Sequence, residues 1–158
     1  MFDKIVVITK KTFLEELIER FNTKGQAKFY IEHSGGSFKE YEASHDAYKK
    51  SLGDLYKLLP NDIKYQYVDR EFLPNFLFGD KDLVITLGPD GLVINTAKYL
   101  IKQPILAVNP DIHRIDGIMI PFDIENLKLY FKNVSSGSFN ISNVSMAKAT
   151  LNNGQVLY

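Results

Sequence analysis

The chain has 158 residues, with nineteen basic and nineteen acidic side chains and no cysteine. Because these charges cancel, no overall field attracts a polyanion, which argues against nucleic acid or an anionic membrane surface as a partner. The lack of cysteine excludes thiol catalysis and thiolate metal sites, and it fits a reducing compartment.

No segment has the pattern of a targeting or membrane element. Met1–Thr9 is a short strand pattern with an acidic residue, and not a basic region followed by a long apolar core. No apolar run approaches the roughly 20 residues that a bilayer-spanning helix needs. A cytoplasmic location is therefore the default expectation.

The first third of the chain predicts a strand followed by helices. Lys4–Thr9 is β-branched and nearly all apolar, as in a strand that is covered on both faces of a parallel sheet. Thr12 and Glu15 form a capping box at the start of a helix that continues to about Asn22. The segment 23–33 favours a short helix, with a strand as the alternative. A long helix that ends near residue 60 follows from apolar residues at helical spacing: Tyr41, Tyr48, Leu52, Leu55 and Leu59.

The middle third alternates strands and helices. Ile63–Asp69 alternates apolar and polar residues, which is typical of a half-buried strand, and a helical turn through 72–76 follows it. Buried strands are predicted at 83–87 and Pro104–Asn109, on either side of a helix over Leu92–Ile101. This alternation indicates a parallel sheet with right-handed crossovers, in a three-layer, Rossmann-like α/β fold.

The last third predicts a change of architecture. A further strand is expected in Asp116–Phe122, followed by a helix over Ile124–Asn133 and a Ser-Ser-Gly-Ser linker. Asn152–Gly154 supplies residues that tolerate positive φ, as in the turn of a hairpin. We therefore expect an α/β nucleotide-binding domain at 1–134, and a linker with the first hairpin of a truncated, β-rich second domain at 135–158.

The turn Gly88–Gly91 joins the second buried strand to its helix. Free backbone N–H groups and the positive end of the helix dipole meet at such a turn, beyond the carboxyl end of a parallel strand, where a phosphate can bind. A compact structural corner in which Asp90 caps the helix explains the same residues equally well. These residues alone leave both readings open.

The segment DLVITLGPDGLVINTAKYL, followed by QPILAVN, resembles the Gly-Gly-Asp-Gly region of the ATP-dependent NAD kinases. Their superfamily also includes the diacylglycerol and sphingosine kinases. In that family an acidic residue, here Asp82, stands at the end of an apolar strand, and a later strand closes in Gly-Val-Asn, here 107–109. The tail MAKATLNNGQVLY resembles the strand pair that opens the family's second domain.

The resemblance implies phosphoryl transfer from ATP to the 2′-hydroxyl of the NAD adenosine ribose, with Mg²⁺ offsetting the charge of the donor phosphates. Asp90 would be the general base or orienting group, and Gly88 and Gly91 would let phosphate approach the backbone. Asn109 would lie near the nucleotide, and Asp111 could reach the same cleft. A family member of this kind is commonly a homo-oligomer, and the isolated fragment would be inactive without the second domain.

Two departures from the family pattern weaken the expected site. Pro89 replaces a glycine, which removes one N–H donor and fixes φ near −65°. Leu92 stands where the family usually has threonine, so a hydroxyl is also absent. A non-catalytic nucleotide-binding regulatory module of the same fold is therefore the alternative, and a lipid kinase of the same superfamily is a third reading.

The three histidines, His33, His45 and His113, lie far apart in the sequence and have no carboxylate at metal-ligand spacing. We therefore expect no zinc site. His45 lies one helical turn from two tyrosines and should sit at the edge of a packed helix face. The loop 109–117 follows a strand at the ligand-binding end of the sheet, and structural and functional readings of it stay open.

Overall fold

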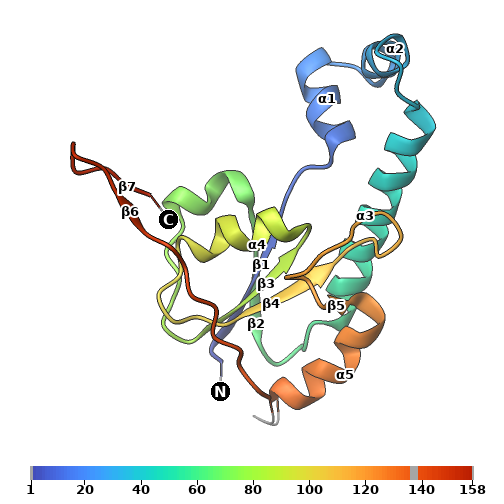
Figure 1. Ribbon diagram of the computed structural model, residues 1–158. Helices are drawn as coiled ribbons and strands as arrows, with labels where there is room; N and C mark the ends of the chain where they lie inside the picture. The colour runs from blue at the N-terminus through green and yellow to red at the C-terminus, as the bar shows by residue number, and fades with distance from the viewer. Residues whose placement is uncertain (1, 136–138, 158) are drawn as a thin grey trace.

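The computed structural model describes residues 2–135 and 139–157 (Figure 1). Five parallel strands form one sheet in the order β2-β1-β3-β4-β5. In chain order these strands are β1 (Lys4–Thr9), β2 (Lys64–Asp69), β3 (Asp82–Leu87), β4 (Ile105–Asn109) and β5 (Phe122–Asp123). Helices cover both faces, so the predicted Rossmann-like, three-layer α/β fold is confirmed. Most of the predicted Ser-Ser-Gly-Ser linker lies outside the described residues.

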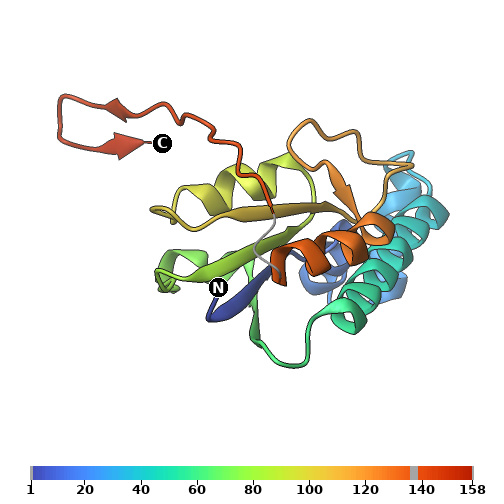
Figure 2. The same cartoon turned by 90° about the horizontal axis from the view of Figure 1, so that it is seen from below.

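Alternating side chains of the central strands build two cores. Ile5 and Val7 of β1 point to the face covered by α3 (Phe38–Leu58) and α5 (Ile124–Ser135). Val6 and Ile8 point to the opposite face, covered by the 3₁₀ helix η1 (Arg70–Asn75) and by α4 (Asp90–Ala97). Figure 2 shows the sheet between these two layers. All six residues of β3 are buried, because both of its faces are covered.

The helices α1 (Phe13–Phe21) and α2 (Lys24–His33) lie beyond the end of the sheet where the strands finish (Figure 1). Together with the start of α3 they form a helical arm, which we define as residues 12–41. The arm has its own small apolar core, formed by Leu14, Ile31, Phe38 and the side chains around them. The capping box of Thr12 and Glu15 is present, and the helical reading of 23–33 is confirmed.

Two predicted elements differ from the structure. The strand expected in Asp116–Phe122 is wrong except at its end, since β5 is only Phe122–Asp123. In this segment Ile118 is 96% exposed and Ile120 is buried against Val93, so its apolar side chains serve packing and loop formation and not strand pairing.

The helix expected at Leu92–Ile101 begins two residues earlier and ends at Ala97. Beyond this end, Tyr99 and Leu100 donate to the carbonyl groups three residues before them, and the Gln103 side chain accepts from the next two backbone N–H groups. The helix therefore closes in a tight turn that Gln103 stabilises.

Two short antiparallel strands, β6 (Ala149–Thr150) and β7 (Val156–Leu157), confirm the predicted hairpin. Gly154 in its turn has a φ of 83°, a conformation that glycine adopts without steric cost. In both views the hairpin extends away from the α/β body (Figures 1 and 2). That it begins a second, β-rich domain stays a prediction.

We expect Leu55→Ala to lower the free energy of unfolding by about 2 to 5 kcal/mol, because this α3 side chain is fully buried against the sheet and its truncation leaves a cavity. Urea denaturation followed by circular dichroism measures the change. The matched control Leu77→Ala removes a leucine that is 90% exposed and should change stability by less than about 0.5 kcal/mol. Equal losses in the two variants would contradict this description of the core.

Candidate functional site

The Gly88–Gly91 corner lies at the carboxyl end of β3, beside the point where the direction of the crossovers reverses. The chain passes from β1 to β2 on one side of the sheet and from β3 to β4 on the other. In open α/β sheets the crevice for ligands lies outside the carboxyl ends of the strands at this reversal. The predicted position of the corner is therefore the one that the fold offers for a ligand.

The two glycines of the corner have different environments. A Cβ on Gly88 would lie 2.8 Å from Cδ2 of Leu92, so glycine there permits close packing of α4 on the strand. A Cβ on Gly91 would meet nothing within 4 Å, so its backbone faces open space. Between them Pro89 has φ −71°, as expected for proline, and precedes the first residue of the helix. Gly91 is therefore the glycine at which a phosphate could reach the backbone.

Asp90 connects the corner to the loop between β4 and β5. Its Oδ2 accepts a hydrogen bond from the Ile118 N–H at 3.1 Å, and its Oδ1 accepts one from the Met119 N–H at 3.0 Å. The residue is the first of α4, and no side-chain cap is present at the helix start. The reading in which Asp90 caps its own helix is therefore wrong, and its carboxylate holds a distant loop instead.

The Asp90 carboxylate is half-buried and not sealed inside the protein. An ionised carboxylate has about four acceptor positions, of which the two backbone N–H groups use two. Its oxygens can therefore still meet a hydroxyl. Gly117 is required next to it, because a Cβ there would lie 3.1 Å from Oδ1 and only 2.0 Å from Cγ1 of Ile120.

Asn109 and Asp111 stabilise the loop that follows β4. The Asn109 amide donates to the Ile115 carbonyl at 2.8 Å, and its side-chain oxygen accepts from the Asp111 N–H at 2.9 Å. Asp111 is buried and forms an ion pair with Arg114 at 2.6 Å. The structure thus brings both residues to the same edge as the corner, but these hydrogen bonds and this ion pair lie within their own loop.

Asp82 lies away from the corner, at the amino end of β3. Its buried carboxylate accepts from the Gly79 N–H at 2.8 Å and lies 3.4 Å from Nζ of Lys4. These contacts close the turn that leads into the strand. Asp82, the acidic residue that matches the family pattern, therefore stabilises a turn in this fold.

The Tyr48 side chain of α3 connects the ends of β1 and β3 at the reversal point. The sequence predicted only a packing role for this residue. Its hydroxyl accepts from the Lys10 N–H at 3.0 Å and donates to the Leu87 carbonyl at 3.2 Å. Burial raises the pKa of this phenol to about 12. No local pattern in the sequence indicates this role, because both partners of the hydroxyl are far from Tyr48 along the chain.

The loop after β1 also anchors the helical arm. Thr12 Oγ1 lies 2.8 Å from Nδ1 of His45 on α3, and Glu15 of α1 pairs with Lys49 at 2.5 Å. His45 is half-buried, in agreement with the predicted edge position. Over residues 2–135 and 139–157, no group of three or more His, Cys, Asp or Glu side chains is placed to hold a metal ion.

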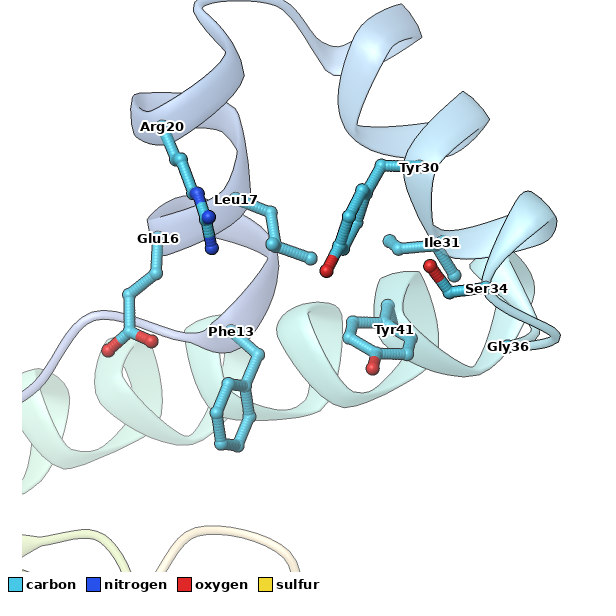
Figure 3. Close-up of a pocket in the computed structure, with 9 residues that line it drawn as sticks. All are labelled: Phe13, Glu16, Leu17, Arg20, Tyr30, Ile31, Ser34, Gly36 and Tyr41. Atoms are coloured by element: carbon cyan, nitrogen blue, oxygen red, sulfur yellow. The ribbon is translucent and has the colours of Figure 1, made fainter.

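A cavity of about 410 Å³ lies within the helical arm, between α1, α2 and α3 (Figure 3). Its wall combines apolar side chains with charged and hydroxyl groups, from Phe13, Glu16, Leu17, Arg20, Tyr30, Ile31, Ser34, Gly36 and Tyr41. The cavity does not include any residue of the Gly88–Gly91 corner. The cavity is therefore not part of the candidate site.

No family model matches this chain, and no curated protein matches it either. The fold is nevertheless clear from the parallel sheet and its two helical layers. Among the helices of the described residues, none is long and apolar enough to cross a membrane. The case for a function therefore depends on the corner and the sequence pattern around it.

We expect Tyr48→Phe to destabilise the protein by about 1 to 3 kcal/mol at neutral pH, because the Lys10 N–H and the Leu87 carbonyl lose their partner.

In the wild type, stability should fall as pH rises from about 10 to about 12, since the unfolded phenol ionises first and the folded one, with its raised pKa, last. Tyr48→Phe should reduce this fall, although Tyr67, whose pKa burial also raises to about 12, retains its part. Denaturant unfolding at several pH values measures both effects, and an unchanged slope would contradict the assignment.

We expect Asp90→Asn to loosen the loop between β4 and β5, because an amide offers one acceptor oxygen where the carboxylate offers two. Amide hydrogen exchange at Ile118 or Met119 should become faster. The control Asp116→Asn changes an exposed aspartate of the same loop and should leave both amides as they are. Equal exchange in wild type and Asp90→Asn would show that the two hydrogen bonds contribute little.

Proposed function

We propose that the Gly88–Gly91 corner binds nucleotide phosphates and that the protein is an NAD-kinase-like phosphotransferase. The reaction would move the γ-phosphoryl group of ATP to the 2′-hydroxyl of the NAD adenosine ribose. One observation carries the proposal: Gly91 presents open backbone at the start of α4, beside the reversal point of the sheet. By their position, the N–H groups of Asp90 and Gly91 have no acceptor within the helix and favour an anion, whereas the Leu92 N–H donates to the Pro89 carbonyl at 2.8 Å.

In this proposal Asp90 orients the acceptor hydroxyl or removes its proton. Phosphoryl transfer depends mostly on positioning and on neutralising charge, so one well-held carboxylate is a suitable group. The bonds from Ile118 and Met119 fix the direction of the side chain. Asn109 and Asp111 act as positioning residues, because they stabilise the loop from which these two N–H groups come.

The chain's own contribution to a magnesium site is small. Mg²⁺ in kinases is commonly held by one or two carboxylates together with substrate phosphates and water. At the corner Asp90 is the one acidic side chain of the Gly88–Gly91 segment, and it already accepts two hydrogen bonds. The ion would therefore arrive with the nucleotide, and it would supply charge neutralisation at the donor phosphates.

A non-catalytic nucleotide-binding module is the second candidate, and the engagement of Asp90 favours it. Both oxygens of the proposed base already hold a structural loop. Pro89 in addition removes a backbone donor from the corner. In this candidate the corner binds a nucleotide and Asp90 transmits its presence to the loop between β4 and β5.

We expect Gly91→Asp to weaken binding of ATP and NAD at least about tenfold, or about 1.4 kcal/mol, because it places a negative charge where the phosphates would lie. Calorimetric titration measures the affinity. Gly25→Asp is the matched control, since Gly25 is also the second residue of its helix, is exposed and has no atom within 4 Å of its missing Cβ. Equal affinities in the two variants, or no binding by the wild type, would refute the proposed site.

The Asp90→Asn variant separates the two candidate functions. NADP formation that Asp90→Asn abolishes while ATP still binds would support the kinase. Nucleotide binding without NADP formation in the wild type would support the non-catalytic module.

A further inference from the structure

The cavity of the helical arm is large enough to hold a small molecule. Its volume of about 410 Å³ lies at the lower end of the roughly 300–1,000 Å³ that is usual for small-molecule sites. Figure 3 shows Leu17 of α1, Ile31 of α2 and Tyr41 of α3 around this space. All three side chains also pack in the apolar core of the arm, so the inner wall of the cavity is held in place.

Aromatic rings form a large part of the wall. Phe13, Tyr30 and Tyr41 line the cavity from three different helices. The Tyr30 ring packs against Phe21, with ring centroids 4.7 Å apart. Phe13 and Tyr30 remain 67% and 43% exposed, so ring surface is still open to a ligand. Such a wall favours an aromatic ligand, because pairs of rings gain energy beyond the burial of their area.

Two side chains of opposite charge, Glu16 and Arg20, also line the cavity. They stand four residues apart on α1, which places them on one face of the helix with Cβ atoms about 5–6 Å apart. Within the described residues neither side chain forms an ion pair. The Arg20 guanidinium lies 5.4 Å from the Phe21 ring, a contact that leaves its N–H groups available.

The lack of an ionic partner distinguishes these two residues from the other charged residues around them. The structure describes all of residues 13–33, and every other glutamate, lysine or arginine in this stretch forms an ion pair. These pairs are Glu15–Lys49, Glu19–Lys11, Lys24–Glu42 and Lys28–Glu32. The two charged side chains that line the cavity are therefore the ones that remain available to a ligand.

Hydroxyl groups add further polar contacts to the same wall. Tyr30, Ser34 and Tyr41 line the cavity. Among the hydrogen bonds of residues 2–135 and 139–157, none involves the side-chain hydroxyl of any of these three residues. A few such groups in a mostly apolar wall are typical of a site that fixes the orientation of a small ligand.

We propose that this cavity binds a free amino acid with an aromatic side chain. The ligand carboxylate accepts hydrogen bonds from Arg20, whose planar guanidinium matches a carboxylate. The ligand ammonium group donates to Glu16, and the ring packs against the aromatic and apolar wall. This site is separate from the Gly88–Gly91 corner and does not depend on what the corner binds.

The two charges of the cavity select a free amino acid over related ligands. A free amino acid has its carboxylate and ammonium group on one carbon atom, so both can meet side chains one helical turn apart. A peptide has these groups at opposite ends. An aromatic acid without an amine would leave Glu16 without a partner, and an aromatic amine would leave Arg20 without one.

An NMR titration of the whole chain with L-phenylalanine tests the proposal. Backbone amides of the arm, residues 12–41, should shift, while those of the Gly88–Gly91 corner should not. The dissociation constant should lie between micromolar and millimolar, as expected for a ligand of about twelve non-hydrogen atoms. Three analogues should each bind about tenfold more weakly or worse: 3-phenylpropionate lacks the ammonium group, phenethylamine lacks the carboxylate, and L-alanine lacks the ring.

Arg20→Gln and Glu16→Gln should each weaken binding of L-phenylalanine about tenfold or more, because each removes one charge-assisted contact. The analogues separate the two contacts. Arg20→Gln should weaken 3-phenylpropionate but not phenethylamine, and Glu16→Gln should do the reverse. Loss of the fold would weaken all ligands alike, so this crossed pattern identifies direct pairing.

Arg70→Gln and Glu40→Gln are the matched controls, since both side chains are exposed and neither lines the cavity. Both variants should bind L-phenylalanine as the wild type does. A wild type whose arm amides do not respond to L-phenylalanine up to its limit of solubility would overturn the proposal. Shifts at the corner in place of the arm, or 3-phenylpropionate binding as tightly as L-phenylalanine, would also overturn it.

Discussion

The whole architecture depends on two neighbouring strands, β1 and β3, being apolar on both faces. Only such strands can accept helices above and below the sheet, and this lets the chain cross over on one face after β1 and on the other after β3. At this reversal the ends of the two strands lie side by side, and the chain continues from them in opposite directions. This position makes the Gly88–Gly91 corner a candidate ligand site, since an identical turn at the amino edge would face no crevice.

Asp90 combines a structural role at the corner with partial exposure of its carboxylate. Its carboxylate bridges α4 and a loop that lies 28 and 29 residues further along the chain, and it remains only half-buried. A group held in this way is well oriented for an incoming hydroxyl, and a ligand that competes for its oxygens would loosen the loop. Both proposed functions of this corner, phosphoryl transfer and signalling, would thus depend on the same two hydrogen bonds.

The sequence predicted those elements whose evidence is local. Apolar periodicity and the Thr12–Glu15 capping box gave the strands and helices of the α/β body, and Gly154 marked the hairpin turn. The prediction that failed concerns residues with distant partners. The apolar residues of 116–122 have the pattern of a strand, but Ile120 packs against Val93 instead. For the same reason the partners of Asp90 and the bridging role of the Tyr48 hydroxyl, 38 and 39 residues from its partners, had no local signal.

The helical arm has a further consequence for how the protein comes apart. Its apolar core of Leu14, Ile31 and Phe38 is separate from the two cores of the sheet. Polar contacts made by Thr12 and Glu15 to the middle of α3 tie it to the body. A unit with a small core and few such ties opens at a lower free energy than the sheet does. Unfolding should therefore begin at the arm, and the parallel strands should be the last part to lose protection.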